Sequence, residues 1–204
     1  MNIQPGIKIT CNGIDGTLGL IVIRNAEPNK RYLLSCMHVL DGGHGSGDVF
    51  MPDINNNVIA RYVDGPEFSH AGFDAALAEI DPQYFPLLSN QVTGSNRIIT
   101  TAAYGMPNME LIKTGMVTKK TRCVIDHFTD YFGNLEAGIV LKPHVNGINK
   151  YCAQGDSGSV WCAKVTGKAI GLHARGQMGN DFTAAASPIK LILNAFNASI
   201  YSPA

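Results

Sequence analysis

A glycine-flanked serine in the last third of the chain has the residue types of a nucleophilic site. The segment G-D-S-G-S at residues 155–159 follows Y-C-A-Q at 151–154 and precedes the apolar Val160–Trp161. A serine hydroxyl is a weak nucleophile near neutral pH, so it needs a base beside it and amide hydrogens directed at the oxyanion that forms. Glycine admits a substrate carbonyl closely and can adopt positive φ. We therefore predict Ser157 as the nucleophile, with the amides of Gly155 and Ser157 as the oxyanion hole.

Two earlier segments supply a base and a carboxylate. His38 ends the apolar, strand-like run at residues 32–40, just before the turn D-G-G, and Asp74 lies in the apolar stretch F-D-A-A-L-A-E-I. A buried carboxylate is costly unless it is hydrogen-bonded or paired. Each residue also fits a structural role, because His38 could be a core histidine, Asp74 a helix cap and Ser157 part of a turn. Their joint occurrence in this order favours a shared site.

The segments S-C-M-H-V-L, F-D-A-A-L and G-D-S-G-S, in the order His, Asp, Ser, resemble the chymotrypsin-like serine proteases over roughly residues 7–190. The resemblance implies Ser157 as nucleophile and His38 as general base, then general acid to the leaving amine. It implies that Asp74 orients the imidazole and stabilises its cation. Asp64 and Asp81 are alternatives to Asp74, which is preferred because a strand-like run follows it. No metal or organic cofactor is implied.

Composition limits the partners. The chain has 204 residues, a formal net charge of zero and 22 glycines, which suits an all-β domain with many turns. Without a basic excess there is no sign of nucleic-acid binding, and the local patch at Lys119–Arg122 reads as a solvated strand edge. The amino terminus lacks the pattern of a secretory signal, and no apolar run is long enough to span a membrane. We expect a cytoplasmic protein that acts on protein or peptide substrates.

The five cysteines show no zinc-like C-x-x-C spacing. We expect free, buried thiols, since a Cys152–Cys162 bridge is disfavoured in a reducing compartment. A metal site built from Cys36, His38, His44 and neighbouring cysteines is a further alternative, but the spacings match no closed zinc site.

Short β-branched or apolar runs separated by Gly, Pro, Asn and Asp clusters predict many strands. In the first part they cover residues 6–11, 17–24, 32–36, 49–51, 58–63 and 75–80. In the second they cover residues 97–103, 111–119, 122–126, 138–141, 159–163, 168–173 and 182–186. The closing segment from Pro188 to Phe196 has helical spacing, with Ser187 as N-cap.

The predicted fold is all-β, with two six-stranded antiparallel β-barrels and a carboxyl-terminal helix. The first barrel, residues 1–85, carries His38 and Asp74, and the second, residues 86–204, carries Ser157 and the helix. The linker is expected near residues 82–94. In the resembling family the catalytic residues lie in the cleft between the barrels.

The segment K-A-I-G-L-H-A-R-G at residues 168–176 is similar to the G-x-H-x-x-G strand of picornavirus-type cysteine proteases and glutamate-specific serine proteases. There a histidine hydrogen-bonds the Gln or Glu before the scissile bond, which implies that His173 lines the substrate pocket. The same resemblance places Tyr151, Gln154 and Arg175 at the substrate. A basic substrate side chain is disfavoured because Tyr151, not an aspartate, occupies the pocket-floor position. His173 also fits a partly exposed strand with no substrate role, and Cys152 departs from the hydroxyl of the glutamate-specific pattern.

The expected mode of activation differs from that of the digestive members of the family. Those enzymes pair a new amino terminus with the aspartate before the serine, but Gly19–Val22 lies inside an expected strand here. We therefore predict an internal partner for Asp156 and activity without zymogen cleavage, or control by a regulatory partner protein or by the substrate. The competing function is a protease-like fold that binds peptides or partner proteins without cleaving them.

Overall fold

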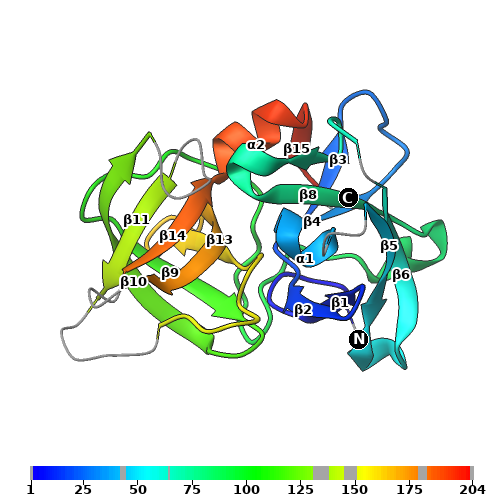
Figure 1. The fold of residues 1–204 in the computed structure, drawn as a ribbon, viewed down its shortest axis with the longest axis horizontal. Coiled ribbons are helices and arrows are strands. Elements are labelled where there is room, and N and C mark those ends of the chain that lie inside the picture. Colours follow the sequence, from blue (N-terminus) through cyan, green and yellow to red (C-terminus); the bar gives the residue numbers. More distant parts are fainter. Residues whose placement is uncertain are drawn as a thin grey trace.

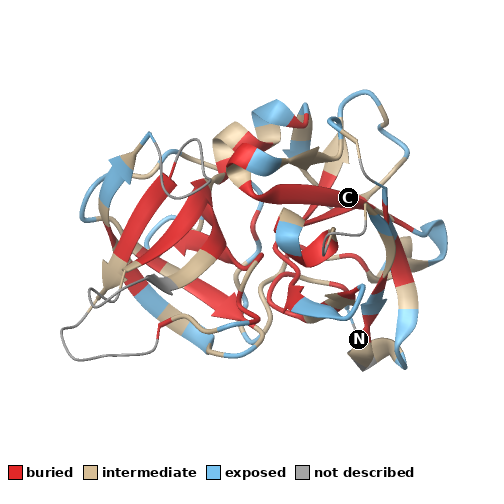
Figure 2. Ribbon diagram, in the orientation of Figure 1, coloured by how far each residue is buried: buried red, intermediate tan, exposed pale blue. Residues whose placement is uncertain are grey.

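The computed structural model describes residues 2–41, 45–63, 65–130, 138–144, 151–178 and 183–202. Figure 1 shows two β-rich halves side by side, with a short helix lying across them at the top. Figure 2 shows that the buried residues follow the strands that face the interior of each half. The predicted all-β architecture with a carboxyl-terminal helix is confirmed.

The first half is a sheet of nine antiparallel strands. Its hydrogen-bonded order is β15 (Ala198–Ile200), β3 (Leu20–Arg24), β4 (Tyr32–Ser35), β8 (Ala75–Ile80), β6 (Asn57–Val63), β5 (Ser46–Met51), β1 (Lys8–Cys11) and β2 (Ile14–Thr17), and β7 (Ser69–His70) pairs with β8.

This sheet curls as half of a barrel and does not close by strand pairing in the described residues, unlike the expected six-stranded barrel. At the free edge the backbone amide of Thr17 donates to the carbonyl of Ser157 in the other half. The end of β2 is therefore bonded across the interface and not to β3.

The second half is a closed barrel of six strands. Around the barrel these are β10 (Lys119–Thr129), β11 (Gly138–Pro143), β14 (Thr183–Pro188), β13 (Ala169–Met178), β12 (Val160–Ala163) and β9 (Glu110–Gly115). β-Branched and apolar residues of these strands alternate into the barrel and fill it around the buried Trp161.

Helical segments are short. They are α1 (Met37–Leu40), α2 (Ile189–Ala195) and the 3-10 turns η1 (Pro52–Ile54), η2 (Ala71–Phe73) and η3 (Pro82–Leu87). The predicted closing helix is present as α2, but its N-cap is Pro188. The Ser187 hydroxyl instead donates to the carbonyl of Phe73 at 2.5 Å, which ties the end of β14 to the turn before Asp74.

Three further expectations need correction. Residues 17–24 are divided at Leu18–Gly19, where Leu18 donates its amide to Ile7 and Gly19 donates its amide to Leu34. Residues 97–103 make only isolated bridges, and Ile98 is 56% exposed. His38 lies on α1 and not at the end of a strand.

The two halves share their packing. Residues of β12 and β13, including Val160 and Leu172, belong to the same apolar core as the first sheet. The carboxyl-terminal β15 pairs with β3, so the end of the chain returns to the first half. This return joins the two halves in one unit around their interface.

Cys11, Cys36, Cys123 and Cys162 are buried free thiols, and Cys152 is half-buried. Within the described residues, no helix has both the length and the apolar character needed to cross a lipid bilayer.

Candidate active site

His38 and Asp74 form a directly bonded pair on the first half. The Asp74 carboxylate lies 2.7 Å from His38 Nδ1 through Oδ2, and its Oδ1 accepts the backbone N–H of His38 at 3.1 Å. The imidazole is 46% exposed and the carboxylate 12% exposed. A carboxylate held this way fixes the ring orientation and leaves Nε2 on the opposite side, free to act as a base.

Local structure explains how the pair forms. α1 begins directly after β4 and carries His38 on its first turn, while η2 ends at Asp74. Asp74 has left-handed backbone angles, φ 46° and ψ 48°, which aspartate tolerates better than most residues. Its carbonyl accepts the amide of Met37 at 3.1 Å. The carboxylate is thus held by both backbone and side-chain bonds to the start of α1.

The two alternative aspartates lie elsewhere. Asp81 caps η3 by accepting the amide of Gln83 at 3.0 Å. It follows β8 directly, so it lies at the opposite end of that strand from Asp74. Asp64 lies outside the described residues.

The loop at residues 155–159 carries the predicted oxyanion hole and is called the oxyanion loop below. Gly155 and Gly158 have φ of 95° and 90°, in the region that favours glycine. A Cβ on Gly158 would lie 2.1 Å from Ser35 Oγ and 2.3 Å from the Thr17 carbonyl oxygen, so only glycine fits against the first sheet.

The amides of Gly155 and Ser157 are available to a ligand. Neither donates a hydrogen bond to another described residue, whereas the neighbouring amides of Asp156, Gly158 and Ser159 bond to the carbonyls of Ala153, His173 and Asp156. Because a trans peptide unit points its N–H and C=O in opposite directions, the Asp156 carbonyl bond to Ser159 turns the Ser157 N–H outward. Free, fixed amides of this kind are what an oxyanion hole requires.

The loop that carries Ser157 packs against the segment that carries His38. Gly158 contacts Ser35, three residues before His38, and the His173 carbonyl on β13 accepts both the Gly158 amide at 2.9 Å and the Cys36 thiol at 3.1 Å. Ser157 itself is half-buried. Among the described residues its hydroxyl makes no hydrogen bond to His38. In ligand-free hydrolases the distance between the nucleophile and its base is often long, and it shortens when substrate binds.

Asp156 is fully buried and has the internal partner that the sequence required. Lys113, also 0% exposed, places Nζ 2.7 Å from Asp156 Oδ2. The carboxylate also accepts the amides of Val117, Thr118 and Ala153 and the hydroxyl of Thr118. Burial alone would raise the pKa of Asp156, but the Lys113 ammonium and these donors hold it below its usual value. The ion pair therefore orders the loop without a new amino terminus.

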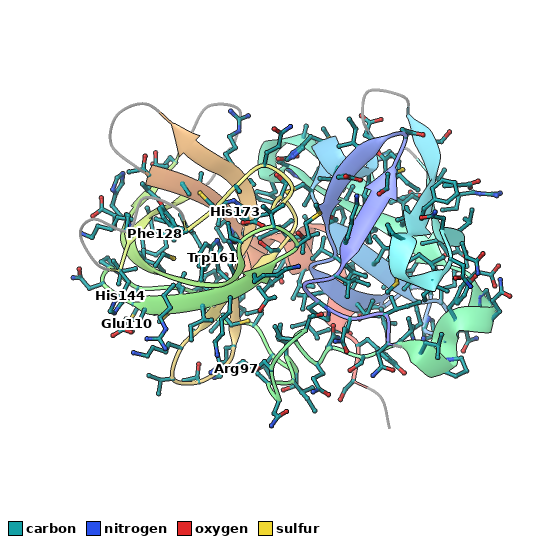
Figure 3. All side chains as sticks on the ribbon, turned by 90° about the horizontal axis from the view of Figure 1, so that it is seen from below. Arg97, Glu110, Phe128, His144, Trp161 and His173 are labelled. Atoms are coloured by element: carbon teal, nitrogen blue, oxygen red, sulfur yellow. The ribbon has the colours of Figure 1, made fainter. Side chains whose placement is uncertain are left out.

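His173, the predicted pocket residue, lies in the interior of the second barrel at 1% exposure. Its Nδ1 accepts the Trp161 indole N–H at 3.4 Å, and the two rings meet edge to face with centroids 6.0 Å apart. Figure 3 shows the two side chains next to each other inside this barrel. The bond assigns the proton of the neutral imidazole to Nε2. Burial, with the positive charge of Lys113, lowers the pKa of His173 to about 3, so the ring is neutral at physiological pH.

The other three predicted substrate residues differ in position. The Tyr151 side chain is buried in the barrel core, with its hydroxyl donating to the Leu141 carbonyl at 2.9 Å. Gln154 is exposed directly before Gly155, and Arg175 is half-buried two residues after His173.

Buried neutral His173 should make the fold acid-sensitive. Above pH 6.5 the residue is neutral in both states, whereas between pH 6.5 and about 3 only the unfolded chain binds the proton. The free energy of unfolding therefore falls as the pH is lowered, and His173 accounts for about 1.4 kcal/mol of this fall per pH unit. Going from pH 7 to pH 5, His173→Gln should lose about 2 kcal/mol less unfolding free energy than the wild type, as measured by urea denaturation. Equal losses in both proteins would show that His173 is not held neutral.

The alternative metal site is only partly described. Ligand atoms of Cys36, His38 and Asp74 lie within 4.8 Å of one another, and His44 lies outside the described residues. However, His38 and Asp74 bond to each other, and Cys36 donates to a backbone carbonyl. Burial, with the charge of Asp74, raises the pKa of the Cys36 thiol well above its usual value. These bonds engage the same atoms that a metal would need.

Three residues that support the site were not identified from the sequence. Lys113 lies in the run E-L-I-K-T-G of β9, two residues after the buried Leu111, so both side chains lie on the inward face of the strand. This two-residue period from Leu111 was the available signal for an inward lysine. Thr17 and Trp161, which hold the oxyanion loop and the His173 ring, carry no comparable signal in the sequence.

Neither a protein-family model nor a curated protein sequence matches the chain. Solved structures do match it. A glutamic acid specific serine protease that uses a histidine triad in substrate binding is 17% identical, with a TM-score of 0.73, covering 98% of this chain and 100% of its own. Nocardiopsis protease (NAPase) is 15% identical, with a TM-score of 0.72, covering 99% of this chain and 100% of its own.

Thermobifida fusca protease A is 14% identical, with a TM-score of 0.69, and the match covers all of both chains. Sequence identities this low show a shared fold and no more. The matches extend over nearly every residue of each protein. The chain therefore has the chymotrypsin-like fold that its sequence motifs predicted.

Proposed function

We propose that this protein is a serine endopeptidase that hydrolyses peptide bonds in protein or peptide substrates through an acyl-enzyme intermediate. The observation that carries the proposal is the bonded His38–Asp74 pair on one half of the fold, together with the glycine-flanked Ser157 loop on the other, which has two unbonded amides and packs against Ser35 of the first sheet. The similar solved structures, one named a serine protease and another a protease, support the same reaction class.

The reaction follows from the roles of these groups. Ser157 Oγ attacks the scissile carbonyl while His38 Nε2 takes its proton, and Asp74 stabilises the resulting imidazolium. The carbonyl oxygen becomes an oxyanion that accepts the N–H groups of Gly155 and Ser157. When the C–N bond breaks, His38 returns the proton to the leaving amine. A water then attacks the acyl group in the same way, which releases the carboxylic acid and restores Ser157.

We propose Glu or Gln as the residue before the scissile bond. A neutral imidazole with its proton on Nε2 donates to a carboxylate or amide oxygen, and the Trp161 bond holds His173 in this form. Among the described residues, the aspartate before Ser157 is not available to a Lys or Arg side chain, because Asp156 is buried against Lys113. The neighbour described as glutamic acid specific adds support.

Profiling with a peptide library tests both parts of the proposal. Purified protein is incubated with a mixed-sequence library, and the products are sequenced by mass spectrometry beside a Ser157→Ala control. We expect new ends that follow Glu or Gln, absent with the variant. Cleavage after other residues would overturn the specificity. Peptide binding without any cleavage would support the alternative, a protease-like binding module.

A further inference from the structure

Thr17 is the buried residue through which the first half of the fold touches the oxyanion loop. It ends β2 and is 0% exposed. Its backbone amide donates to the Ser157 carbonyl at 2.8 Å, and its hydroxyl donates to the Gly155 carbonyl at 2.8 Å. One residue therefore holds two carbonyls of the loop that carries the nucleophile.

The same hydroxyl reaches a third segment. Its oxygen accepts the amide of Met116, in the turn between β9 and β10, at 3.1 Å. Val117 and Thr118 in that turn bind the Asp156 carboxylate. The Thr17 hydroxyl thus joins β2, this turn and the oxyanion loop with one donated and one accepted hydrogen bond, which uses both of its functions.

The bonds to Thr17 lie on both sides of the free Ser157 amide. The peptide unit joining Gly155 to Asp156 is held at its carbonyl by the Thr17 hydroxyl, and the unit joining Ser157 to Gly158 is held at its carbonyl by the Thr17 amide. The unit between them carries the Ser157 N–H. Gly155, at φ 95°, has no Cβ to oppose rotation of this peptide unit, so the unit is restrained by its two hydrogen bonds, from the Thr17 hydroxyl to its carbonyl and from its Asp156 N–H to the Ala153 carbonyl.

We propose that Thr17 is a positioning residue for catalysis, whose hydroxyl keeps the oxyanion loop in the conformation that directs both amides at the substrate carbonyl. This inference rests on the proposed protease activity. Without the hydroxyl, the Gly155 carbonyl and the Met116 amide lose a buried partner, and rotation of the Gly155 peptide becomes favourable. The effect falls on the transition state, because the oxyanion forms only there.

The test compares Thr17→Val, which keeps the shape and removes the hydroxyl, with Thr17→Ser, which keeps it. We expect Thr17→Val to lower kcat about 10- to 100-fold with KM changed less than about threefold, and Thr17→Ser to stay within about threefold of the wild type. Equal kcat for Thr17→Val and the wild type would overturn the proposal, and so would a change confined to KM.

Ser35→Ala is the matched control for loss of a buried hydroxyl. The Ser35 hydroxyl donates to the Thr17 carbonyl at 2.9 Å and packs against Gly158, so this variant removes one bond to Thr17 and a packing contact, but no hydrogen bond to the oxyanion loop. We expect a fall in unfolding midpoint similar to that of Thr17→Val, with kcat close to the wild type. A kcat loss as large as that of Thr17→Val would assign the effect to general loosening and overturn the proposal.

Labelling by a fluorophosphonate separates this inference from the proposed function, because the phosphonyl oxygen enters the oxyanion site without any need for a known substrate. A labelled wild type with slower labelling of folded Thr17→Val supports the inference. A labelled wild type with an equal rate in Thr17→Val overturns the inference alone. Absence of labelling in the folded wild type contradicts the protease function itself.

Discussion

Lys113→Met is expected to lower the unfolding free energy by about 3–5 kcal/mol and to remove most of the catalytic activity. Lys113 and Asp156 are both fully buried and 2.7 Å apart, so the variant leaves a carboxylate uncompensated in the barrel. Asp156 either takes up a proton or moves toward solvent, and both changes disturb the loop that carries Ser157. Urea denaturation and the rate of peptide hydrolysis measure the two effects.

The double variant Lys113→Met with Asp156→Asn is the control for this prediction. Removing both charges relieves the uncompensated carboxylate, so the double variant should be more stable than Lys113→Met alone. The amide still accepts hydrogen bonds from Val117 and Thr118, so part of the activity should return. A single variant as stable and active as the wild type would show that the ion pair does not order the loop.

Asp74→Asn is expected to reduce kcat by about 10³- to 10⁴-fold with little loss of stability. The backbone amide of His38 keeps its acceptor at Oδ1, so α1 remains attached to the residue after η2. The side-chain NH₂, however, replaces the oxygen that lies 2.7 Å from His38 Nδ1. It would force the proton onto Nε2, where the ring can no longer accept the proton of Ser157. Steady-state kinetics and thermal unfolding measure both quantities.

Asp81→Asn serves as the matched control for this substitution. Asp81 is exposed, and within the described residues its carboxylate bonds only to the start of η3, where an asparagine oxygen also caps. Its kcat should stay within about twofold of the wild type. If Asp81→Asn lost activity and Asp74→Asn kept it, the assignment of the carboxylate to Asp74 would be wrong.

Much of the fold could be predicted because the strands carry local signals. Runs such as Tyr32–Ser35 and Ala75–Ile80 are apolar or β-branched and end at turn residues, and they form β4 and β8. Helical spacing after Pro188 predicted α2. The opening of the first sheet and the return of β15 could not be predicted in this way, because both depend on partners far away in the chain.

The site shows the same division. The types and order of His38, Asp74 and Ser157 were visible because each stands out in its local context. The need for an internal partner of Asp156 also followed from the sequence, but its identity did not. A lysine in a strand usually lies in solvent, and Lys113 is buried only because Asp156, 43 residues later, meets it in the barrel. The spacing of Tyr151 to Ser157 predicted a position at the floor of the substrate pocket, and in the structure its ring packs in the barrel core.

The most direct test of the account is to locate a fluorophosphonate adduct on the intact, folded protein by mass spectrometry. The account predicts one adduct, on Ser157, which disappears in Ser157→Ala and forms far more slowly in His38→Ala. An unlabelled folded protein, an adduct on another serine, or equal labelling of His38→Ala would contradict the claim that these side chains act together across the interface of the two halves.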